Sequence, residues 1–178
     1  MARASDLDRR GFLAAAAGAA AWLARPGRAP AEGAPPAALP LLETSRFVYV
    51  SPLLASGEES ACHGEVWFGW LDGAVLVNTR RGTWKVRALR DRQLDRARIW
   101  VGDHGAWKTG LTGSGRNEAF RAAPCFDAKA RFETDRAVLD RLLALYETKY
   151  GSEFERWSED MRTGFYAGER MLIHYQPV

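Results

Sequence analysis

Short apolar stretches separated by polar turns dominate the chain from residue 46 onward, and this pattern predicts a mainly β domain. The first strand is expected over 46–54 and the second, rich in aromatic side chains, over 65–71. Asp72-Gly73 is a typical two-residue hairpin signal. The chain is therefore expected to turn back at once into a third strand over 74–79.

After the third strand the sequence predicts one short basic helix that begins after Thr83. Residues 98–102 are expected to form a fourth strand and residues 117–126 a further one. The glycine-rich segment 102–115 between them is expected to be either a hairpin or a loop near a ligand.

Two helices and a last strand are expected at the end of the chain. Residues 135–150 carry apolar side chains at helical spacing, and Gly151 is placed to end that helix. Ser152 and Glu155 have the spacing of a capping box, which predicts a second helix that closes at Gly164. With a last strand over 170–176, this order favours a small antiparallel barrel of the mainly β (α+β) class over a sandwich.

The first 24 residues resemble a targeting signal. Arg9 and Arg10 precede Phe12, Leu13 and an alanine-rich stretch, whose length of about a dozen residues falls short of the roughly 20 that span a bilayer. Paired arginines in this setting are similar to a bacterial twin-arginine export signal, which implies a periplasmic or secreted protein. The alternatives are an uncleaved membrane anchor or an amphipathic arm.

Residues 25–40 hold five of the eight prolines and predict a flexible linker. One folded domain is then expected over 41–178, with no stable membrane span once the signal is cleaved. Residues 1–40 carry a net charge of +2, which leaves +1 of the total +3 for the domain. This balance gives no general case for nucleic-acid binding.

The two cysteines and three histidines show no metal-ligand spacing, so a structural zinc site is not expected. Cys62 and Cys125 leave two interpretations open, a disulfide in an oxidising compartment or inert buried thiols.

The strand, loop and helix start over 74–90 carry the candidate chemistry. A helix N-terminus leaves backbone N–H groups unpaired, and Thr79 and Thr83 add hydroxyl groups. Lys85 and one of the loop arginines, Arg80 or Arg81, add positive charge. Together these groups favour a bound anion such as phosphate, although a Thr-capped helix with solvated basic residues is a common arrangement.

With the strands placed, residues 45–177 resemble the FMN-binding split barrel of the pyridoxamine 5'-phosphate oxidase-like superfamily. In that family a lysine six residues after the threonine that ends the third strand contacts the FMN phosphate, and Thr79 and Lys85 have this spacing. Thr83 fills a position that is usually Ser or Thr. The resemblance implies a six-stranded antiparallel split β-barrel with a short helix after strand three and two helices near the C-terminus.

Two positions depart from the family's oxidases. Trp84 stands where those oxidases have an arginine on the phosphate, and Phe68 where they have a lysine near the flavin. These departures argue against oxidation of pyridoxamine phosphate itself.

The resemblance implies a homodimer with its cofactor at the subunit interface. It also implies a set of cofactor-binding residues, namely Val66, Trp67, Asn78, Thr79, Arg81, Thr83, Trp84 and Lys85. Trp67, Trp84 and Trp107 are candidates to stack on a planar ring, although most of the seven tryptophans are expected to fill the core or an interface.

The predicted function is that of an exported FMN-dependent oxidoreductase that acts on a small molecule. The alternatives are a deazaflavin-dependent reductase and a non-catalytic protein that binds haem or another small ligand. No Ser-His-Asp, Cys-His or paired-carboxylate pattern indicates a catalyst made of protein side chains alone.

Overall fold

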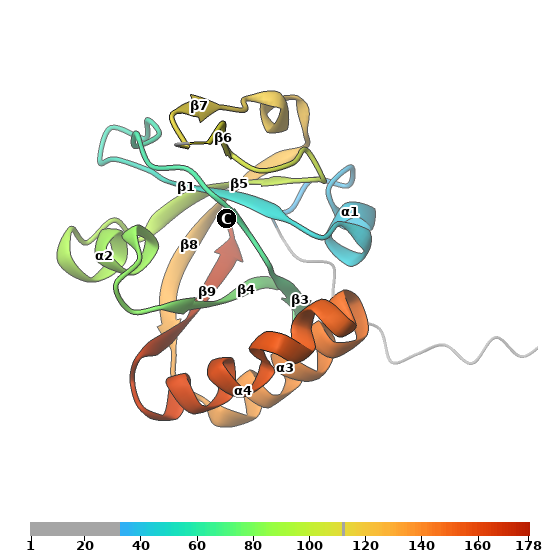
Figure 1. Cartoon of the computed structure of the whole chain (residues 1–178). Helices are drawn as coiled ribbons and strands as arrows, with labels where there is room; N and C mark the ends of the chain where they lie inside the picture. The colour runs from blue at the N-terminus through green and yellow to red at the C-terminus, as the bar shows by residue number, and fades with distance from the viewer. Residues whose placement is uncertain (1–32, 112) are drawn as a thin grey trace, which may run out of the picture.

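The computed structural model describes residues 33–111 and 113–178, so the predicted export signal over 1–24 lies outside the described residues. Its main feature is a seven-stranded antiparallel sheet (Figure 1). The strands of this sheet are β1 (Val48–Pro52), β2 (Glu65–Val66), β3 (Gly69–Leu71), β4 (Ala74–Arg80), β5 (Arg96–Val101), β8 (Cys125–Glu133) and β9 (Arg170–Pro177). The other elements are α1 (Leu39–Thr44), α2 (Trp84–Asp91), β6 (Lys108–Thr109), β7 (Gly115–Arg116), the 3-10 helix η1 (Ala119–Ala122), α3 (Arg136–Tyr150) and α4 (Ser152–Tyr166).

The two edge strands of the sheet are consecutive in the sequence, so the chain itself joins the two edges. Its strand order is β2-β1-β5-β8-β9-β4-β3, so β2 and β3 lie at opposite ends of the order. Only Trp67 and Phe68 separate these two strands in the sequence. The single strand predicted over 65–71 is thus divided into β2, which pairs with β1, and β3, which pairs with β4. The predicted antiparallel split barrel is confirmed, with its split at this division. Its sheet has seven strands and not the predicted six, because the division turns one expected strand into two.

The tight hairpin predicted at Asp72-Gly73 is also confirmed. Both residues have positive φ, 51° and 79°, as the favoured two-residue turn requires. β3 and β4 pair directly on either side of this turn, from Leu71 opposite Ala74 to Gly69 opposite Leu76.

The strand predicted over 117–126 is wrong. Residues 119–122 form the 3-10 helix η1, and the strand β8 runs from Cys125 to Glu133. The inward positions of β8 include Phe126, Ala128 and Ala130, which alternate with polar residues. Two of these three are small alanines, so the alternation gives a weak hydrophobic signal. The glycine-rich segment contains the short hairpin of β6 and β7.

The two long helices α3 and α4 pack together on one side of the barrel (Figure 1). Leu139, Leu142 and Tyr146 of α3 are fully buried and form a core cluster with Leu76 of β4 and Leu172 of β9. This cluster packs α3 and β9 against β4, the strand that leads to the predicted phosphate site.

Gly151 ends α3 with a positive φ of 54°, as predicted. The capping box predicted at Ser152 is absent, because Gly151 is the N-cap of α4 and Ser152 already belongs to the helix. The helix also continues past Gly164 to Tyr166. Gly164 makes room for a neighbour, since a Cβ atom there would lie 3.1 Å from Cγ of Arg170.

The folded domain begins before the predicted end of the linker. Ala38 is fully buried and α1 starts at Leu39, whereas the linker was expected to reach residue 40. Leu42 on this helix is also buried and anchors the helix to the barrel core. Cys62 and Cys125 are both unpaired and exposed, so neither a disulfide nor a buried thiol is present. Within the described part of the chain, no helix combines the length and apolar character that crossing a membrane requires.

Candidate functional site

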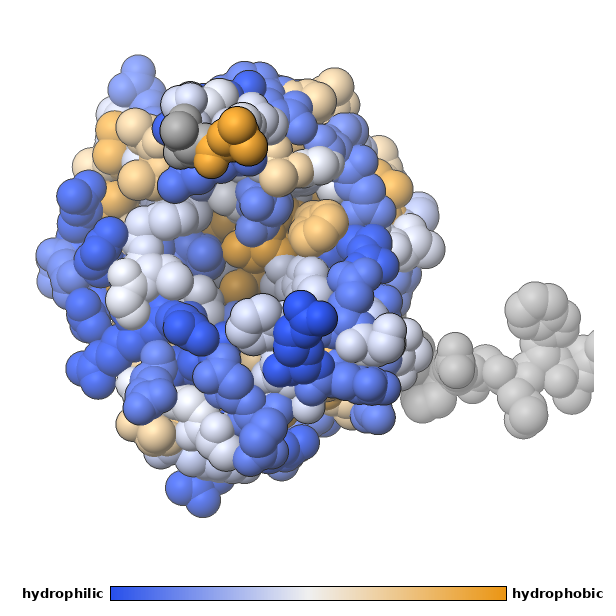
Figure 2. Space-filling model, in the orientation of Figure 1, coloured by the Kyte–Doolittle hydropathy of each residue, from blue (hydrophilic) through white to orange (hydrophobic). Residues whose placement is uncertain are grey.

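A cavity of about 490 Å³ lies where the barrel is split. β3 pairs with β4 only as far as Leu76, and the chain that precedes β3 turns away to pair with β1. The later residues of β4, from Val77 to Arg80, therefore pair with β9 on one edge only. Figure 2 shows this face of the molecule hollowed, with hydrophobic atoms in the hollow and hydrophilic ones around it. The volume lies in the range of about 300–1,000 Å³ typical of small-molecule sites.

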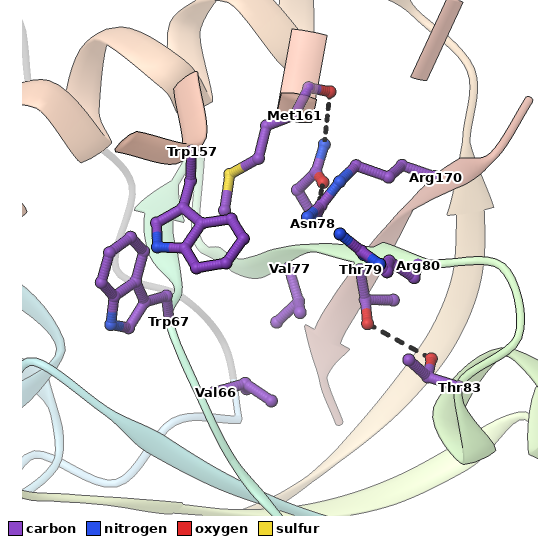
Figure 3. Close-up of a pocket in the computed structure, with 10 residues that line it drawn as sticks. All are labelled: Val66, Trp67, Val77, Asn78, Thr79, Arg80, Thr83, Trp157, Met161 and Arg170. Carbon is purple, nitrogen blue, oxygen red and sulfur yellow. Dashed lines mark hydrogen bonds between the residues drawn. The ribbon is translucent and has the colours of Figure 1, made fainter. Parts of the chain in front are cut away.

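One side of the cavity is apolar and aromatic. Val66 and Trp67 come from the divided strand, Val77 from β4, and Trp157 and Met161 from α4 (Figure 3). Met161 is buried, whereas Trp157 is 40% exposed, so this part of the cavity wall is open to solvent. This wall suits the flat face of an aromatic ligand.

Two tyrosines of α3 hold the backbone at the split. The hydroxyl of Tyr150 accepts a hydrogen bond from the Phe68 N–H at 2.9 Å and lies 3.1 Å from the Phe68 carbonyl. The hydroxyl of Tyr146 donates to the Trp67 carbonyl at 3.0 Å. These contacts replace the ladder hydrogen bonds that Trp67 and Phe68 lack. Burial raises the pKa of both tyrosines, so each hydroxyl keeps its proton.

The opposite side of the cavity carries a pair of threonine hydroxyls. The Oγ1 atoms of Thr79, at the end of β4, and Thr83 lie 3.2 Å apart (Figure 3). Thr83 is the N-cap of α2, but its side chain makes no capping hydrogen bond to the helix. The two hydroxyls therefore lie together at the positive end of a helix, where an anion is stabilised.

Lys85, in the first turn of α2, is a buried cation. Its side chain does not line the cavity, and its Nζ lies 4.9 Å from the centroid of the Trp84 ring. Within residues 33–111 and 113–178, no carboxylate forms an ion pair with this ammonium group. Burial lowers the pKa of Lys85 to about 8, and the negative charge of Glu65 opposes that shift. An anion bound close to Lys85 would offset the cost of burying its charge.

Two arginines share one carboxylate at the rim of the cavity. Arg170 donates hydrogen bonds to Asp160 Oδ2, at 2.7 and 3.1 Å, and to Asn78 Oδ1 at 3.0 Å. Arg80 lies 3.6 Å from the same Asp160 oxygen. The hydrogen bonds from Arg170 lower the pKa of Asp160, which is therefore ionised at neutral pH.

The structure brings five of the eight predicted cofactor-binding residues to the cavity: Val66, Trp67, Asn78, Thr79 and Thr83. The other three lie outside its lining. Arg81 is exposed, Trp84 packs against Gly64, and Lys85 is buried beside Trp84. Trp107, a further stacking candidate, is buried in a separate aromatic cluster with Tyr49, Trp100 and Phe120.

Sequence reasoning did not place four lining residues in the site: Val77, Trp157, Met161 and Arg170. It left open whether Arg80 or Arg81 adds positive charge there, and the structure puts Arg80 in the lining. Trp157 and Met161 are four residues apart and therefore share one face of the second long helix, so the sequence did carry a signal for these two. Arg170 gave no such signal. It reaches the cavity because β9 pairs with β4, which places Arg170 directly opposite Arg80.

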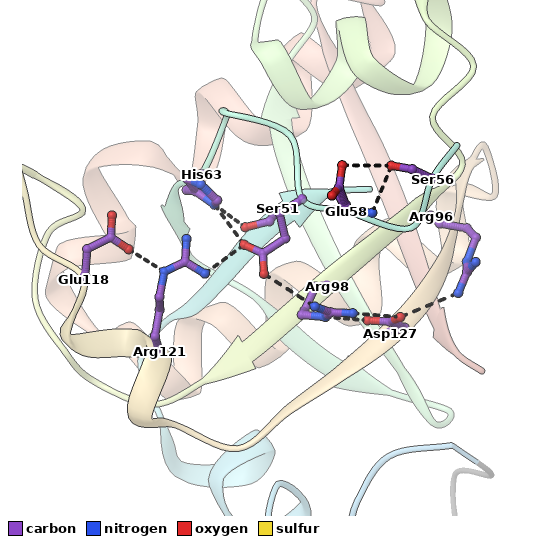
Figure 4. A network of polar contacts seen from close by, with 10 residues as sticks. Ser51, Ser56, Glu58, His63, Arg96, Arg98, Glu118, Arg121 and Asp127 are labelled. Carbon is purple, nitrogen blue, oxygen red and sulfur yellow. Dashed lines mark hydrogen bonds and ion pairs between the residues drawn. The ribbon is translucent and has the colours of Figure 1, made fainter. Parts of the chain in front are cut away.

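A second polar cluster, with His63, Arg98 and Arg121, lies on another part of the barrel (Figure 4). Glu59 joins these three residues. This carboxylate contacts Arg121 at 2.9 Å, Arg98 at 3.5 Å and His63 Nδ1 at 3.7 Å. Ser51 bonds the same Nδ1 atom and is fully buried. In a hydrolytic triad the serine and the acid contact different ring nitrogens of the histidine, so this arrangement is not that of a triad. The cluster instead joins the loop before β2 to the neighbouring strands.

Comparison with solved structures identifies proteins with a similar fold. Campylobacter jejuni ChuZ matches with a TM-score of 0.50 and 12% identity over 78% of this chain and 50% of that chain. HutZ, the heme storage protein from Vibrio cholerae, has a TM-score of 0.48 and 16% identity over 79% and 87% of the two chains. A putative pyridoxamine 5'-phosphate oxidase from Listeria innocua has a TM-score of 0.48 and 13% identity over 78% and 89%.

The similarity is one of fold. At these identities the likeness to ChuZ shows the fold alone, and none of the matches assigns a ligand or an activity to this chain. The sequence matches no protein-family model and no curated protein.

Proposed function

We propose that the protein is an FMN-dependent oxidoreductase whose cofactor occupies the cavity at the split. The observation that carries this proposal is the pairing of two walls in one cavity. Trp67 offers aromatic surface on one side, and the paired hydroxyls of Thr79 and Thr83 lie on the other. FMN combines a planar ring with a phosphate and therefore matches both walls.

The residues fit this cofactor in charge as well as in shape. The phosphate would lie against Thr79 and Thr83 at the start of α2. Lys85 does not line the cavity, so it would stabilise the phosphate as a buried charge in the first turn of the helix and not as a direct contact. Each charge-assisted hydrogen bond of this kind contributes about 1.5–3 kcal/mol. Stacking of the ring on an indole adds roughly 0.5–1.5 kcal/mol.

A bound FMN supplies the redox chemistry, because it can accept and return a hydride. The chain's own residues bind and orient the ring and keep water from it. Trp67 does so from a fixed position, because Tyr146 and Tyr150 hold the backbone on either side of it. The substrate binds on the open side of the cavity, near the exposed indole of Trp157.

The proposal includes export and self-association. The paired arginines and alanine-rich stretch over 1–24 support export by the twin-arginine route, which carries proteins that are already folded. The exposed Trp157 beside the cavity supports a homodimer with the cofactor at the subunit interface, as the family resemblance implies. The mass of the mature protein from its host tests the first point, and light scattering in solution tests the second.

The experiment for the function is mass spectrometry of the small molecule that co-purifies with the full chain from its native host. The expected result is the mass of FMN, together with a flavin absorbance spectrum. The mass of a deazaflavin would show that the cavity holds this analogue in place of FMN. A haem mass with a Soret band, or a protein without any bound small molecule that also fails to bind added FMN, would overturn the assignment.

A further inference from the structure

Arg80, Arg170 and Asp160 form a polar cluster on the far side of β4 from the proposed phosphate contacts. Thr79 and Arg80 are neighbours in β4, so their side chains point to opposite faces of the sheet. Thr79 points toward Thr83, whereas Arg80 points toward Asp160 of α4. The cavity therefore extends around the unpaired edge of β4. Thr79 lines it on one face of the strand and Arg80 on the other (Figure 3).

The guanidinium group of Arg170 has unused hydrogen-bonding capacity. Its side chain is only 8% exposed and lines the cavity. Three hydrogen bonds join it to Asp160 and Asn78, whereas an arginine has five N–H donors. Within the described part of the chain the other two N–H groups have no acceptor. Buried N–H donors are normally paired, so a ligand with an acceptor in the cavity could form hydrogen bonds with the two remaining N–H groups.

The cluster also carries an excess of positive charge. Arg80 and Arg170 face each other across β4 and β9, a position in which like charges repel. Asp160 is their shared counter-ion, and its contact with Arg80 is long at 3.6 Å. Two cations therefore share one carboxylate, and a second anion would relieve their repulsion.

Aromatic surface lies next to this charge. Trp157 precedes Asp160 by three residues on α4, so the two side chains share one face of the helix. Met161 follows Asp160 and is also part of the cavity wall. An anionic group near the arginines would therefore place an attached ring against Trp157.

We propose that Arg80 and Arg170 form a binding site for the carboxylate, sulfonate or phosphate group of an aromatic ligand that stacks on Trp157. Asp160 holds the two arginines in place and weakens the site, because it neutralises half of their charge. This site is separate from the phosphate contacts at Thr79 and Thr83 and does not depend on which cofactor the cavity holds.

The test uses two fluorescent probes that differ only in the anionic group, anilinonaphthalene sulfonate and the neutral phenylnaphthylamine. Both are titrated into the purified full chain, and the ratio of their dissociation constants is the readout. The wild-type protein is expected to bind the sulfonate more tightly than the neutral probe. Arg80→Gln is expected to reduce this preference roughly fivefold and to leave the affinity of the neutral probe unchanged.

Asp160→Asn is expected to change the preference for the sulfonate probe in the opposite direction. It removes the counter-ion, so it is expected to raise the preference for the sulfonate roughly threefold or more. Arg156→Gln is the matched control, because Arg156 is an exposed arginine of α4 that does not line the cavity. Circular dichroism confirms that each variant is folded.

The proposal is overturned if Arg80→Gln and Asp160→Asn leave the ratio unchanged, or if they change the affinity of both probes equally. Binding of FMN is measured in parallel on the same proteins. A chain that does not bind FMN but keeps an Arg80-dependent preference for the sulfonate would overturn the proposed function and leave this site in place.

Discussion

The indole of Trp67 lies flat on the ring of Tyr150, with 4.3 Å between the ring centroids and 8° between the planes. Trp67 belongs to the break between β2 and β3, and Tyr150 is the last residue of α3. The packing of α3 on the barrel therefore sets the position of one wall of the cavity. A change that loosens α3 from the barrel is therefore expected to move Trp67 and alter the shape of the proposed site.

Tyr150→Phe is expected to lower the free energy of unfolding by about 1–3 kcal/mol, because it leaves the buried N–H of Phe68 without its partner while keeping the stacked ring. Urea denaturation measures this change. Tyr166→Phe is the control, since Tyr166 is 47% exposed and its loss of a hydroxyl is expected to change stability by less than about 0.5 kcal/mol. Equal effects of the two substitutions would refute the role given to the Tyr150 hydroxyl.

The buried ammonium of Lys85 is expected to make the protein without ligand more stable at alkaline pH. Its pKa is about 8 in the folded protein and 10.5 in an unfolded chain, so the unfolded state binds more protons between these values. Stability therefore rises as the pH increases from about 8 to 10.5, and the cost of the buried charge is fully present below pH 8.

Lys85→Met isolates this effect from that of Lys149, whose pKa burial also lowers to about 8. The variant is expected to be more stable than the wild type at neutral pH and to show a smaller rise in stability toward pH 10. Denaturation at a series of pH values provides the comparison. A variant with the wild-type slope would show that Lys85 titrates normally.

Acid is expected to destabilise the protein through His174. Burial and the nearby Arg131 lower its pKa from 6.5, and its Nδ1 has no hydrogen-bond partner in the described residues. Because the unfolded state takes up a proton first, stability falls as the pH drops below 6.5 through the folded-state pKa. The negative charges of Glu133 and Asp72 oppose the shift.

His174→Leu is expected to reduce the loss of stability between pH 7 and about pH 5. His63 is a second contributor, since burial and Arg121 lower its pKa as well, so part of the acid dependence is expected to persist. If the wild type and His174→Leu lose stability in parallel, His174 is not a source of the pH dependence.

Local signals made much of the fold predictable. Asp72-Gly73 specifies a turn that few other residue pairs adopt, and the apolar spacing of residues 135–150 is helical over its whole length. β8 was misplaced because alanines at 128 and 130 mark the buried face only weakly. The division of strand 65–71 was also hidden, because it depends on tyrosines of α3 some 80 residues later.

The candidate site was predictable only on the side formed by one stretch of sequence. Thr79 and Thr83 are four residues apart, and their pairing follows from a strand that runs into a helix. Arg170 and Trp157 come from distant elements, and only the pairing of β9 with β4 and the packing of α4 bring them to the cavity. The burial of Lys85 was not expected either, because a lysine on a short basic helix usually extends into solvent.

The most direct test of the proposed FMN site is a titration of the purified full chain with FMN, followed by quenching of tryptophan fluorescence. The wild type is expected to show saturable quenching with one FMN bound per chain. Lys85→Ala is expected to bind at least about tenfold more weakly, a loss of about 1.4 kcal/mol or more. Wild-type protein that shows no saturable quenching, or a Lys85→Ala variant with unchanged affinity, would contradict the account.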